Sequence, residues 1–508
     1  MKKLIALMLA LLMLLPLTVA CKKEEPQGEE TESADVAAPG EESESVTETE
    51  TFINDIDTLP TDLDLGGKEV NVVTRSTTEY EFQSTAGAKG TLVERAVYAR
   101  EASIEERFNT KINIIPMDAD WGNLADFTQK VYAEYLNPTA NWHVLSVHST
   151  LLYRMVSSGY LQDLNNFTNI DMNKVWWSSL LYKDMNVDGH MYAAMGDINR
   201  TLYEYMQVMY YNETKFEEAL ASEGGKEMLY TLIEDGEWTW EKMTQFAAKY
   251  GSGDETKGGD GSYGFVLNAH AFRALFAAMD TKVDDKDEAG QIYYPETASE
   301  RLINTVTNIN TFLDQPNTQF PGGAGDSQTT QNKLFAEGKV LFYPQVLEAA
   351  KTVTSTMKDK FGVIPYPKYD EYQDQYKTIC KSSVSAVGIM ATVTSESDML
   401  AAGTVTEALC MEGYKQVTPV YYQTVLQKQY LNDSRSSALL ETIRNGLTVA
   451  SVASLYADVD LFPASFQASV LADGSVDVVS IYTGRLSDAK KTIENFYTAM
   501  REMGLANF

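Results

Sequence analysis

The chain has 508 residues, with 41 Lys and Arg against 72 Asp and Glu, and a formal net charge of −31 at pH 7. So acidic a protein repels phosphate backbones, which argues against nucleic-acid binding, and it disfavours anionic membranes and ligands in general, although a local pocket can differ. A chain of this length exceeds one ordinary hydrophobic core, so two or more lobes are expected. Beyond the amino terminus no run of eighteen apolar residues appears, so no other membrane span is expected.

The amino terminus has the pattern of a secretory signal. Two lysines precede an apolar stretch at residues 4–15, which has signal-peptide length and is too short to span a bilayer stably. Leu17-Thr-Val-Ala-Cys21 follows and resembles a bacterial lipobox, apart from Thr18, where aliphatic residues usually stand. We expect a lipoprotein signal peptide at residues 1–20 and a palmitate-bearing Cys21 that anchors the chain in the cell membrane. A signal peptide cut elsewhere, or a retained membrane anchor, is the alternative.

Residues 21–60 are predicted to form an acidic, disordered tether. Between Lys22 and Asp57 the chain has thirteen acidic residues and two lysines, and most of the others are Ser, Thr, Pro, Gly or Ala. Such a segment cannot bury enough apolar surface to fold, and its like charges extend it. It would hold a folded body away from a membrane surface.

The next hundred residues alternate strands and helices. Strands are predicted at 69–74, 111–115 and 142–147, and helices at 91–109, 124–135 and 151–158. This alternation predicts a parallel α/β lobe, whose ligands bind beyond the carboxyl ends of the strands. Those ends are polar, at residues 75–78, 117–121 and 146–149. They are candidate functional loops, although an ordinary solvated turn explains each of them equally well.

Residues 190–250 combine a polar loop, an aromatic strand and two helices. The loop at 195–200 is rich in Gly, Asp and Asn, and a helix is predicted from Phe216. A second helix opens at Thr239, with one face made by Trp240, Met243, Phe246, Ala247 and Tyr250. This part of the chain resembles the family 1 extracellular solute-binding proteins of ABC importers, which bind sugars and oligosaccharides. In that family such a loop borders the ligand cleft, and a Trp-Thr-Trp-Glu segment opens a helix of the second lobe.

The resemblance continues through most of residues 67–508. A Gly-x-Leu-x-x-Leu segment at 159–164 resembles the point where the family's chain crosses between lobes. The Phe-x-x-Gly-Lys segment at 335–339 resembles a helix end, followed by a strand that returns to the first lobe. A strand-to-proline segment follows at 361–367, and residues 383–391 are predicted to form a buried strand. From residue 404 onward the chain is expected to be mostly helical.

The resemblance implies an α/β fold of the type II periplasmic-binding-protein kind, with two discontinuous lobes. Lobe 1 is predicted to comprise residues 61–165 plus 335–393, and lobe 2 residues 166–334 plus 394–508. The chain is expected to cross between them near 159–171, 328–339 and 391–397. Hinge closure on a ligand held between the lobes is implied as well.

No pattern in the sequence singles out a catalytic or cofactor site. Cys380 and Cys410 lack Cys-x-x-Cys spacing, so two buried free thiols are favoured, with a disulfide left open. The four histidines lack zinc-site spacing, and the Asp-rich turns at 254–260 and 284–287 lack the register of a calcium loop. No nucleophile motif or nucleotide loop is present. We therefore predict no enzyme activity, no metal and no cofactor, although the many carboxylates leave a glycosidase open.

Candidate ligand contacts combine aromatic rings for sugar faces with polar groups for hydroxyls. Trp176 and Trp177 are expected on different sides of a helix, so that one could face a cleft, with core packing as the alternative. Core packing is also the alternative for Tyr203. Replacing Asp197 with alanine is expected to weaken binding by about 1–3 kcal/mol through a lost buried hydrogen bond. The predicted contacts are Arg75, Tyr80, Trp121, Trp176, Asp197, Asn199, Tyr203 and Tyr343.

The predicted function is that of a monomeric, lipid-anchored solute-binding protein on the extracytoplasmic face of the cell membrane. It would capture a sugar or oligosaccharide and deliver it to the transmembrane subunits of an ABC permease, with oligopeptides or other neutral solutes left open. Two alternatives remain: a surface glycan-binding lipoprotein without a permease, and a secreted glycoside hydrolase.

Overall fold

The computed structural model describes residues 57–82, 87–251, 261–315, 318–319, 327–353, 356–428, 434–457, 461–471 and 476–504. The chain forms two compact units, Met1–Thr61 and Asp62–Phe508, and every element named below belongs to the second. The predicted signal peptide, Cys21, nearly all of the tether and the turn at 254–260 lie outside the described residues. Within the described ranges, no helix has the length and apolar character needed to cross a bilayer.

The first sheet has four strands in the order β11-β3-β1-β2. The central strand β1 pairs parallel with β2 and β3, and β11 pairs antiparallel with β3. Val70, Val72 and Val73 of β1 are fully buried, which explains the central position of this strand. These strands and helices confirm the predicted strand–helix alternation: β1 (Lys68–Arg75), α3 (Leu92–Phe108), β2 (Thr110–Met117), α4 (Leu124–Tyr135), β3 (Val144–His148), α5 (Ser149–Arg154) and β11 (Ser385–Ile389).

The second sheet has five strands in the order β10-β4-β9-β5-β8. One of its helices, α10, begins where the Thr239 hydroxyl caps the Lys242 amide at 3.4 Å, as the sequence predicts. The strands are β4 (Gln207–Asn212), β5 (Tyr263–Val266), β8 (Thr318–Gln319), β9 (Val340–Val346) and β10 (Phe361–Ile364). The accompanying helices are α8 (Glu213–Leu220), α9 (Gly225–Glu234), α10 (Trp240–Lys249), α11 (Ala269–Ala278), α12 (Glu300–Leu313), α13 (Ser327–Ala336) and α14 (Ala350–Val353).

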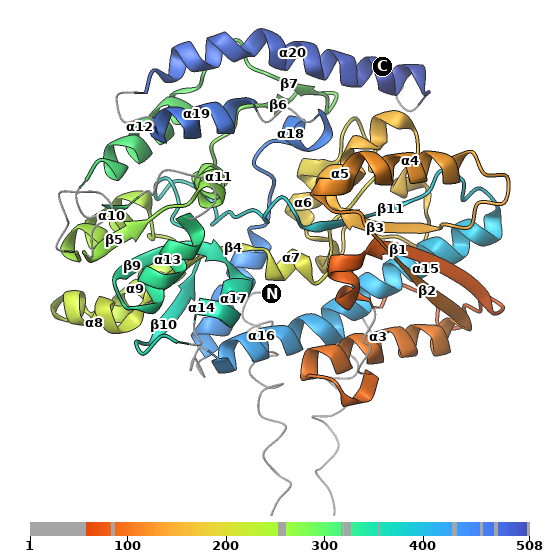
Figure 1. The fold of residues 1–508 in the computed structure, drawn as a ribbon, viewed down its shortest axis with the longest axis horizontal. Coiled ribbons are helices and arrows are strands. Elements are labelled where there is room, and N and C mark those ends of the chain that lie inside the picture. Colours follow the sequence, from red (N-terminus) through yellow and green to blue (C-terminus); the bar gives the residue numbers. More distant parts are fainter. Residues whose placement is uncertain are drawn as a thin grey trace, which may run out of the picture. The chain divides into compact units, whose positions relative to one another are not determined.

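We call the first sheet with the helices packed on it the first lobe, and the second sheet with its helices the second lobe (Figure 1). The chain leaves the first sheet after β3, passes through α6 (Ser179–Met185) and α7 (Thr201–Glu204), and enters the second at β4. It returns between β10 and β11. Because β11 comes more than two hundred residues after β3, the first lobe is discontinuous, as predicted.

Strand β9 does not return to the first lobe, so that prediction and the predicted crossing at 328–339 are wrong. β9 pairs antiparallel with β4 and parallel with β5, in the middle of the second sheet. All seven of its residues are buried, and a strand covered on both faces belongs at the centre of a sheet. β10 also lies in the second sheet, so within 335–393 only β11 joins the first.

A third crossing lies farther along the chain than the predicted one at 391–397. Helix α15 (Glu396–Glu412) packs on α3 and β1 of the first lobe. A π-helical turn, η9 (Gly413–Val417), continues it into α16 (Thr418–Lys428), which lies between α3 and α14. Helix α17 (Ser434–Asn445) then packs on β10. The crossing is therefore made by one nearly continuous helical run, which in Figure 1 descends from α15 on the right to α16 at the bottom.

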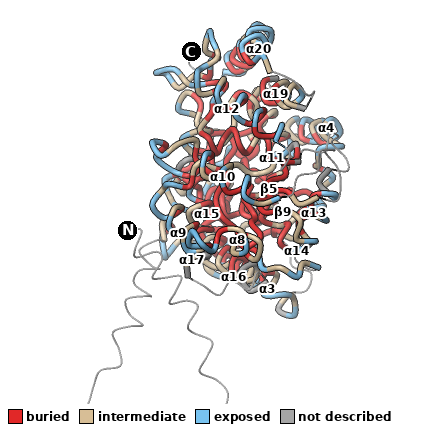
Figure 2. The backbone as a smooth tube through the Cα atoms, turned by 90° about the vertical axis from the view of Figure 1, so that its left-hand side faces the viewer, coloured by how far each residue is buried: buried red, intermediate tan, exposed pale blue. Residues whose placement is uncertain are grey.

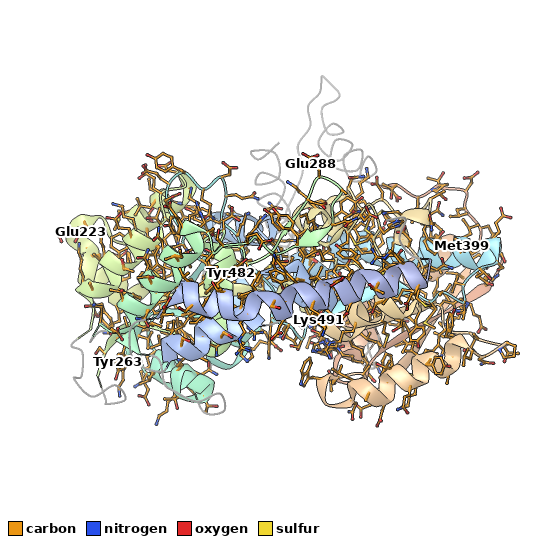
Figure 3. All side chains as sticks on the ribbon, turned by 90° about the horizontal axis from the view of Figure 1, so that it is seen from above. Glu223, Tyr263, Glu288, Met399, Tyr482 and Lys491 are labelled. Carbon is orange, nitrogen blue, oxygen red and sulfur yellow. The ribbon has the colours of Figure 1, made fainter. Side chains whose placement is uncertain are left out.

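The carboxyl-terminal segment lies over both lobes. It comprises α18 (Val452–Ala457), α19 (Leu461–Leu471) and α20 (Val478–Glu502), beside the hairpin of β6 (Asp285–Lys286) and β7 (Ile292–Tyr293). Near its start, α20 stacks Tyr482 on Phe462 at 4.7 Å between ring centroids. Farther on, it packs on η4 (Val156–Ser158) of the first lobe and on α18. Figure 3 looks down on α20, with Tyr482 above the second lobe and Lys491 near the middle of the helix.

The buried residues gather between the helices in the interior, while the outer faces of α20 and α3 are exposed (Figure 2). Cys380 and Cys410 are free thiols, as favoured by the sequence; Cys410 is buried as predicted, whereas Cys380 is only half-buried. Among the described residues, no group of three or more His, Cys, Asp or Glu is placed to hold a metal ion.

Candidate ligand-binding cleft

A cavity of about 130 Å³ lies where the two lobes meet, and we call it the interlobe cavity. The first lobe contributes Ser149 and Thr150, directly after β3. The second lobe contributes His270 and Arg273 of α11. The segments 379–384 and 448–451, together with the α18–α19 region, close the remaining sides. Several separate stretches of chain therefore meet at one site, and ligand sites occur preferentially at such interfaces between domains.

The interlobe cavity is too small for most ligands in this conformation. Ligand pockets usually have volumes of about 300–1,000 Å³. A second cavity of about 180 Å³ lies on the other side of Thr448–Ser451, because residues 448–451 line both. Even a modest outward movement of the lobes or of this segment would create a larger groove.

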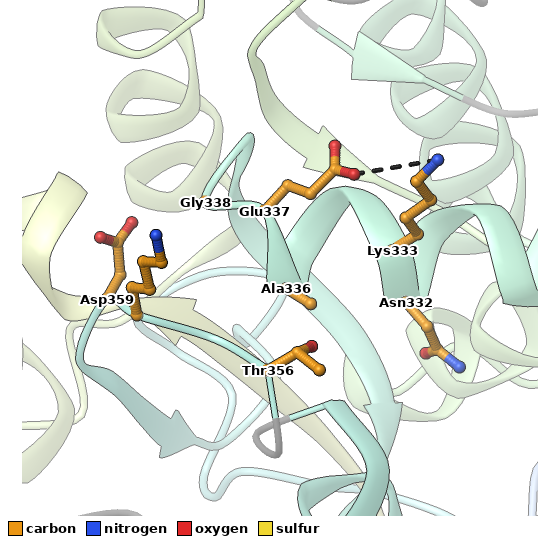
Figure 4. A pocket seen from close by; sticks show the side chains of 8 residues that line it. Asn332, Lys333, Ala336, Glu337, Gly338, Thr356 and Asp359 are labelled. Carbon is orange, nitrogen blue, oxygen red and sulfur yellow. Dashed lines mark ion pairs between the residues drawn. The ribbon is translucent and has the colours of Figure 1, made fainter.

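A larger hollow of about 660 Å³ lies on the surface of the second lobe (Figure 4). It is lined by α13 and by residues 356–359, and an ion pair at 3.9 Å joins Lys333 to Glu337 at its rim. Every lining residue belongs to one lobe. A ligand here would make the same contacts whether the lobes were open or closed, so it could not drive their movement. The interlobe cavity is the better candidate.

The lining of the interlobe cavity combines polar and basic groups with apolar side chains such as Leu181, Val384 and Leu455. Ser149, Thr150, Ser382, Thr448, Ser451 and Ser454 supply hydroxyl groups. Gln207 supplies an amide, and Lys381, Arg273 and His270 supply basic groups. Among the described lining residues there is no carboxylate. Met195 also lines the cavity, so the loop at 195–200, predicted to border the cleft, touches it through this one residue.

The carboxyl ends of the first-lobe strands carry the one exposed aromatic side chain among the predicted contacts. Trp121 follows β2, has 59% of its surface exposed, and lies with its ring 6.0 Å from that of His148. The Arg154 guanidinium lies 5.2 Å above the same indole. Since His148 directly precedes Ser149, Trp121 is one side chain removed from the cavity wall.

His148 should make the protein sensitive to acid. Burial, together with the positive charge of Arg75, lowers the pKa of this imidazole from its usual 6.5 to about 4. The unfolded chain therefore binds the proton more tightly, so the stabilisation is full above pH 6.5 and is lost as the pH falls towards 4. We expect a loss on the order of 2–3 kcal/mol in the free energy of unfolding. Urea unfolding between pH 7.5 and 4.5 would measure it.

His148→Gln is the control for this prediction. A variant that cannot titrate at this position should lose less stability over the same pH interval, by the amount attributed to His148. If wild type and variant decline in parallel, another group is responsible for the acid sensitivity.

Arg75 and Asn199 belong to a buried polar network rather than to the cavity. The Arg75 guanidinium donates to Asp120 at 3.1 Å and to Ser385 at 2.8 Å. Asn199 donates to Ser146 at 2.7 Å. At the centre, Glu81 accepts hydrogen bonds from Thr201, Ser385 and Asn199. These contacts fix the loop at 195–200 to the first sheet.

Trp176 and Trp177 are both buried and point to the same partner, so the predicted placement on different sides is wrong. They lie in the short helix η6 (Val175–Trp177), with exposures of 0% and 1%. The Trp176 indole donates to one carboxylate oxygen of Glu407 at 3.0 Å, and the Trp177 indole donates to the other at 2.7 Å. A 3₁₀ turn followed by a change of direction at Ser178, where φ is 57°, allows this arrangement.

The other predicted contacts are also held by protein partners. Asp197 is fully buried, accepts a hydrogen bond from Thr418 at 2.6 Å and forms an ion pair with Arg444. Tyr203 is fully buried, with its ring 4.9 Å from that of Tyr421. Tyr343 is buried in the second sheet, where Gln345 donates to its hydroxyl at 2.8 Å.

Tyr80 is half-buried between the lobes. Its hydroxyl donates to Glu204 at 2.9 Å, and the Arg200 guanidinium lies 4.7 Å from its ring. Lys351 of the second lobe reaches the same Glu204 at 3.1 Å. The contact therefore ties η1 (Ser76–Glu81) of the first lobe, through α7, to the second lobe.

None of the eight predicted contacts lines the interlobe cavity. The sequence indicated the loop at 146–149, which supplies Ser149. It gave no sign of Arg273, Lys381 or residues 448–451, because their shared position depends on pairing between distant segments. As ligand contacts, the eight residues remain a prediction, and Trp121 is the best placed of them.

Comparison with known proteins supports the fold. A family model described as bacterial extracellular solute-binding protein matches residues 100–410, more than half of the chain. No curated protein matches this chain in sequence. M. tuberculosis UspC has a TM-score of 0.52 and 12% identity, over 84% of this chain and 100% of that one. A cyclo/maltodextrin-binding protein complexed with maltotetraose has a TM-score of 0.49 and 14% identity, over 85% of this chain and 96% of that one.

The maltose/maltodextrin-binding domain MalE from Bdellovibrio bacteriovorus, bound to maltotriose, gives a TM-score of 0.47 and 15% identity, over 85% of this chain and 100% of that one. The sheet topology and the likeness to UspC confirm the predicted α/β fold with two discontinuous lobes.

Proposed function

Because the chain belongs to the bacterial extracellular solute-binding proteins, we propose that it captures a sugar or oligosaccharide between its lobes and delivers it to an ABC importer. The observation that carries this proposal is the interlobe cavity, to which both lobes contribute hydroxyl, amide and basic groups. Such groups form hydrogen bonds with sugar hydroxyls. Two of the structural relatives are described as complexes with maltotetraose and maltotriose.

Binding would work by shifting the population of open and closed forms. A ligand that touches Ser149 on one side and Arg273 on the other gains both sets of contacts only when the lobes close. Closure also removes water, which strengthens each remaining polar contact. The family and its structural relatives are binding proteins, so no chemical step is proposed.

The family implies an extracytoplasmic location. We further propose that Cys21 carries the lipid anchor, that residues 21–60 act as the tether, and that the body is a monomer. The permease subunits would recognise the closed lobes. Lobe boundaries follow the sheets: residues 62–158 with 385–412 in the first lobe, and residues 207–364 in the second.

A thermal-shift screen of the whole chain against monosaccharides, oligosaccharides and peptides would test the proposal. A ligand at about one hundred times its Kd adds about 2.7 kcal/mol to the stability, which raises the Tm visibly. A rise with sugars and no product formation supports it. Release of shortened sugars would instead establish a glycoside hydrolase. Sugar binding without closure in small-angle scattering would favour a surface glycan-binding protein.

Trp121→Ala should weaken sugar binding without unfolding the protein. An indole that is 59% exposed in the free protein can bury much of its face against a sugar ring. We expect a loss of about 1 kcal/mol, roughly fivefold in Kd, from the lost apolar burial. Calorimetric titration would measure it. Tyr98→Ala is the matched control, because Tyr98 is an exposed aromatic on the outer helix α3, with 49% of its surface accessible. Equal Kd values for both variants and wild type would remove Trp121 from the site.

A further inference from the structure

The interlobe cavity has a neighbour of similar size, and one short segment of chain separates the two. The interlobe cavity has a volume of about 130 Å³ and the second cavity a volume of about 180 Å³, and Thr448–Ser451 lines both. Since ligand pockets usually have volumes of about 300–1,000 Å³, neither cavity alone has the room of an ordinary site. Joined, the two would reach the lower end of that range. We call Thr448–Ser451 the partition.

The first end of the partition is fixed by Thr448. Its amide donates to the Thr378 carbonyl at 2.9 Å, and its hydroxyl donates to the carboxylate of Asp184. Asp184 lies near the end of α6 and is half-buried. The hydroxyl bond therefore ties the partition to the segment that leads from the first lobe into the second.

The other end of the partition is fixed by Ser451, directly before α18. Its hydroxyl accepts a hydrogen bond from the Ser454 amide at 3.0 Å, as a residue that caps a helix does. Val449 and Ala450, between the two ends, are half-buried and make no hydrogen bond to another described residue. The middle of the partition can therefore move without breaking a hydrogen bond within this part of the chain.

The second cavity supplies carboxylates, which are absent from the described lining of the interlobe cavity. Carboxylates accept strong hydrogen bonds from hydroxyl groups. Asp280 already forms an ion pair with Lys377 at 2.7 Å. Asp184, by contrast, is bonded to the hydroxyl of Thr448, which is the same kind of donor as a sugar hydroxyl.

A ligand hydroxyl could therefore replace the Thr448 hydroxyl at little cost. Each of them would donate one hydrogen bond to the carboxylate of Asp184, so one charge-assisted bond is lost and one is gained. Release of Thr448 would remove the side-chain bond that ties the partition to α6. A ligand that starts in the interlobe cavity could then extend into the second one.

From this arrangement we infer that the two cavities are subsites of one binding site, and that the solute is an oligosaccharide whose rings occupy both after the partition moves aside. In the bound form, a ligand hydroxyl donates to Asp184 in place of Thr448. This inference rests on the proposed function and names the class of its substrate. A monosaccharide would occupy one subsite and leave the partition in place.

The test is a calorimetric titration of the whole chain with neutral ligands of increasing length. Malto-, cello-, xylo- and galacto-oligosaccharides are used, each with its monosaccharide, because the four series differ in sugar or linkage but share the change in length. In the series that binds, we expect the affinity to rise at least tenfold between the monosaccharide and the length that fills both subsites. Further rings should then add little.

A double-mutant cycle locates the effect at the partition. Thr448→Val removes the hydroxyl that the ligand must displace, so it should tighten binding of the longer ligand at least threefold. In an Asp184→Ala background the same substitution should change this affinity less than twofold, because the exchanged hydrogen bond is then absent from the free and the bound forms. Thr442→Val is the matched control, since the Thr442 hydroxyl donates to the Ala438 carbonyl at 3.0 Å within α17. A Tm measurement on each variant verifies that it is folded.

The outcomes separate this inference from the proposed function. Equal affinity for a monosaccharide and for every longer member of its series overturns the inference and leaves sugar capture intact. Unchanged or weaker binding by Thr448→Val also overturns it, because Thr448 would then not be displaced. The same holds for a gain of equal size with and without Asp184. Failure of every sugar, short or long, to bind overturns both proposals.

Discussion

Replacing Asp197 with alanine is expected to lower the free energy of unfolding by about 3–5 kcal/mol, because it leaves a buried cation without its partner. The Asp197 carboxylate is fully buried and forms an ion pair with Arg444, whose side chain is 2% exposed. The same guanidinium nitrogen donates to the Val175 carbonyl at 3.0 Å, and Thr418 donates to the other carboxylate oxygen at 2.6 Å. The ion pair thus joins the loop at 195–200 to α17, and the Thr418 hydrogen bond joins it to α16.

Denaturant unfolding of Asp197→Ala would measure this effect. The double variant Asp197→Leu with Arg444→Met is the control, since exchanging a buried ion pair for apolar residues of similar size is often close to neutral. It should recover most of the lost stability. A loss below about 1 kcal/mol in the single variant would contradict the buried ion pair. The sequence alone predicts instead a loss of about 1–3 kcal/mol in ligand affinity, so titration of the folded fraction separates the two roles.

The second large loss of stability is expected on substitution of Glu407, which accepts hydrogen bonds from two tryptophans. Glu407 lies on α15 and is fully buried, and its two oxygens accept the indole hydrogen bonds of Trp176 and Trp177. Glu407→Ala would leave two buried N–H groups without these acceptors, at about 1–3 kcal/mol each. Together with the space left by the side chain, we expect about 3–5 kcal/mol of destabilisation, measured by denaturant unfolding.

Glu407→Gln provides the graded control for this prediction. Its amide oxygen can accept one indole hydrogen bond, while its NH₂ group faces the other indole donor. It should therefore destabilise the protein, but by less than alanine does. Trp177→Phe introduced into the Glu407→Ala background should cost less than Trp177→Phe alone, because its hydrogen bond is already lost. Additive costs would show that the two side chains do not interact.

The elements were predictable because local patterns encode them. The apolar spacing that predicts a helix at 124–135 is the face that buries Phe127 and Val131 in α4. Thr91 caps α3 in a capping box with Glu94, and Asn268 caps α11. Each of these signals lies within a few residues of the structure that it specifies.

The sheet partners were not predictable in the same way. The sequence of β9, Val340–Val346, would suit a central position in either sheet. No residue pattern within or near the strand specifies β4 and β5 as its neighbours. The wrong lobe assignment at 335–364 follows from this. Only the tertiary pairing decides where a uniformly buried strand belongs.

The predicted contacts are absent from the lining of the interlobe cavity for a related reason. Asp, Asn, Trp and Tyr suit a sugar cleft, but they equally suit a buried polar network. For Asp197 the decisive partner is Arg444, and for Trp176 it is Glu407, each more than two hundred residues away. Trp121 differs from the others only in being exposed, which follows from its position after an exterior strand end, and its contact with ligand stays a prediction.

The lobes are joined by helices at two opposite edges, and this limits how they can move. Along one edge α20 packs on both lobes, and along the other α15, η9 and α16 do the same. A rigid helix that contacts two bodies fixes the separation of its contact points. Moving the lobes straight apart would detach a helix from one of them. A rotation that opens only one of these edges would do the same.

Detaching the carboxyl-terminal half of α20 would expose Ile493, Phe496, Tyr497 and Met500, each no more than 7% accessible. At about 1.5–3 kcal/mol for each apolar side chain, this exceeds the roughly 5.5 kcal/mol that turns a 1:99 population into 99:1. An opening that keeps both helical connections in place would be a rotation about an axis that passes near both of them. Under the proposed function, ligand binding would then be coupled to that one angle between the lobes.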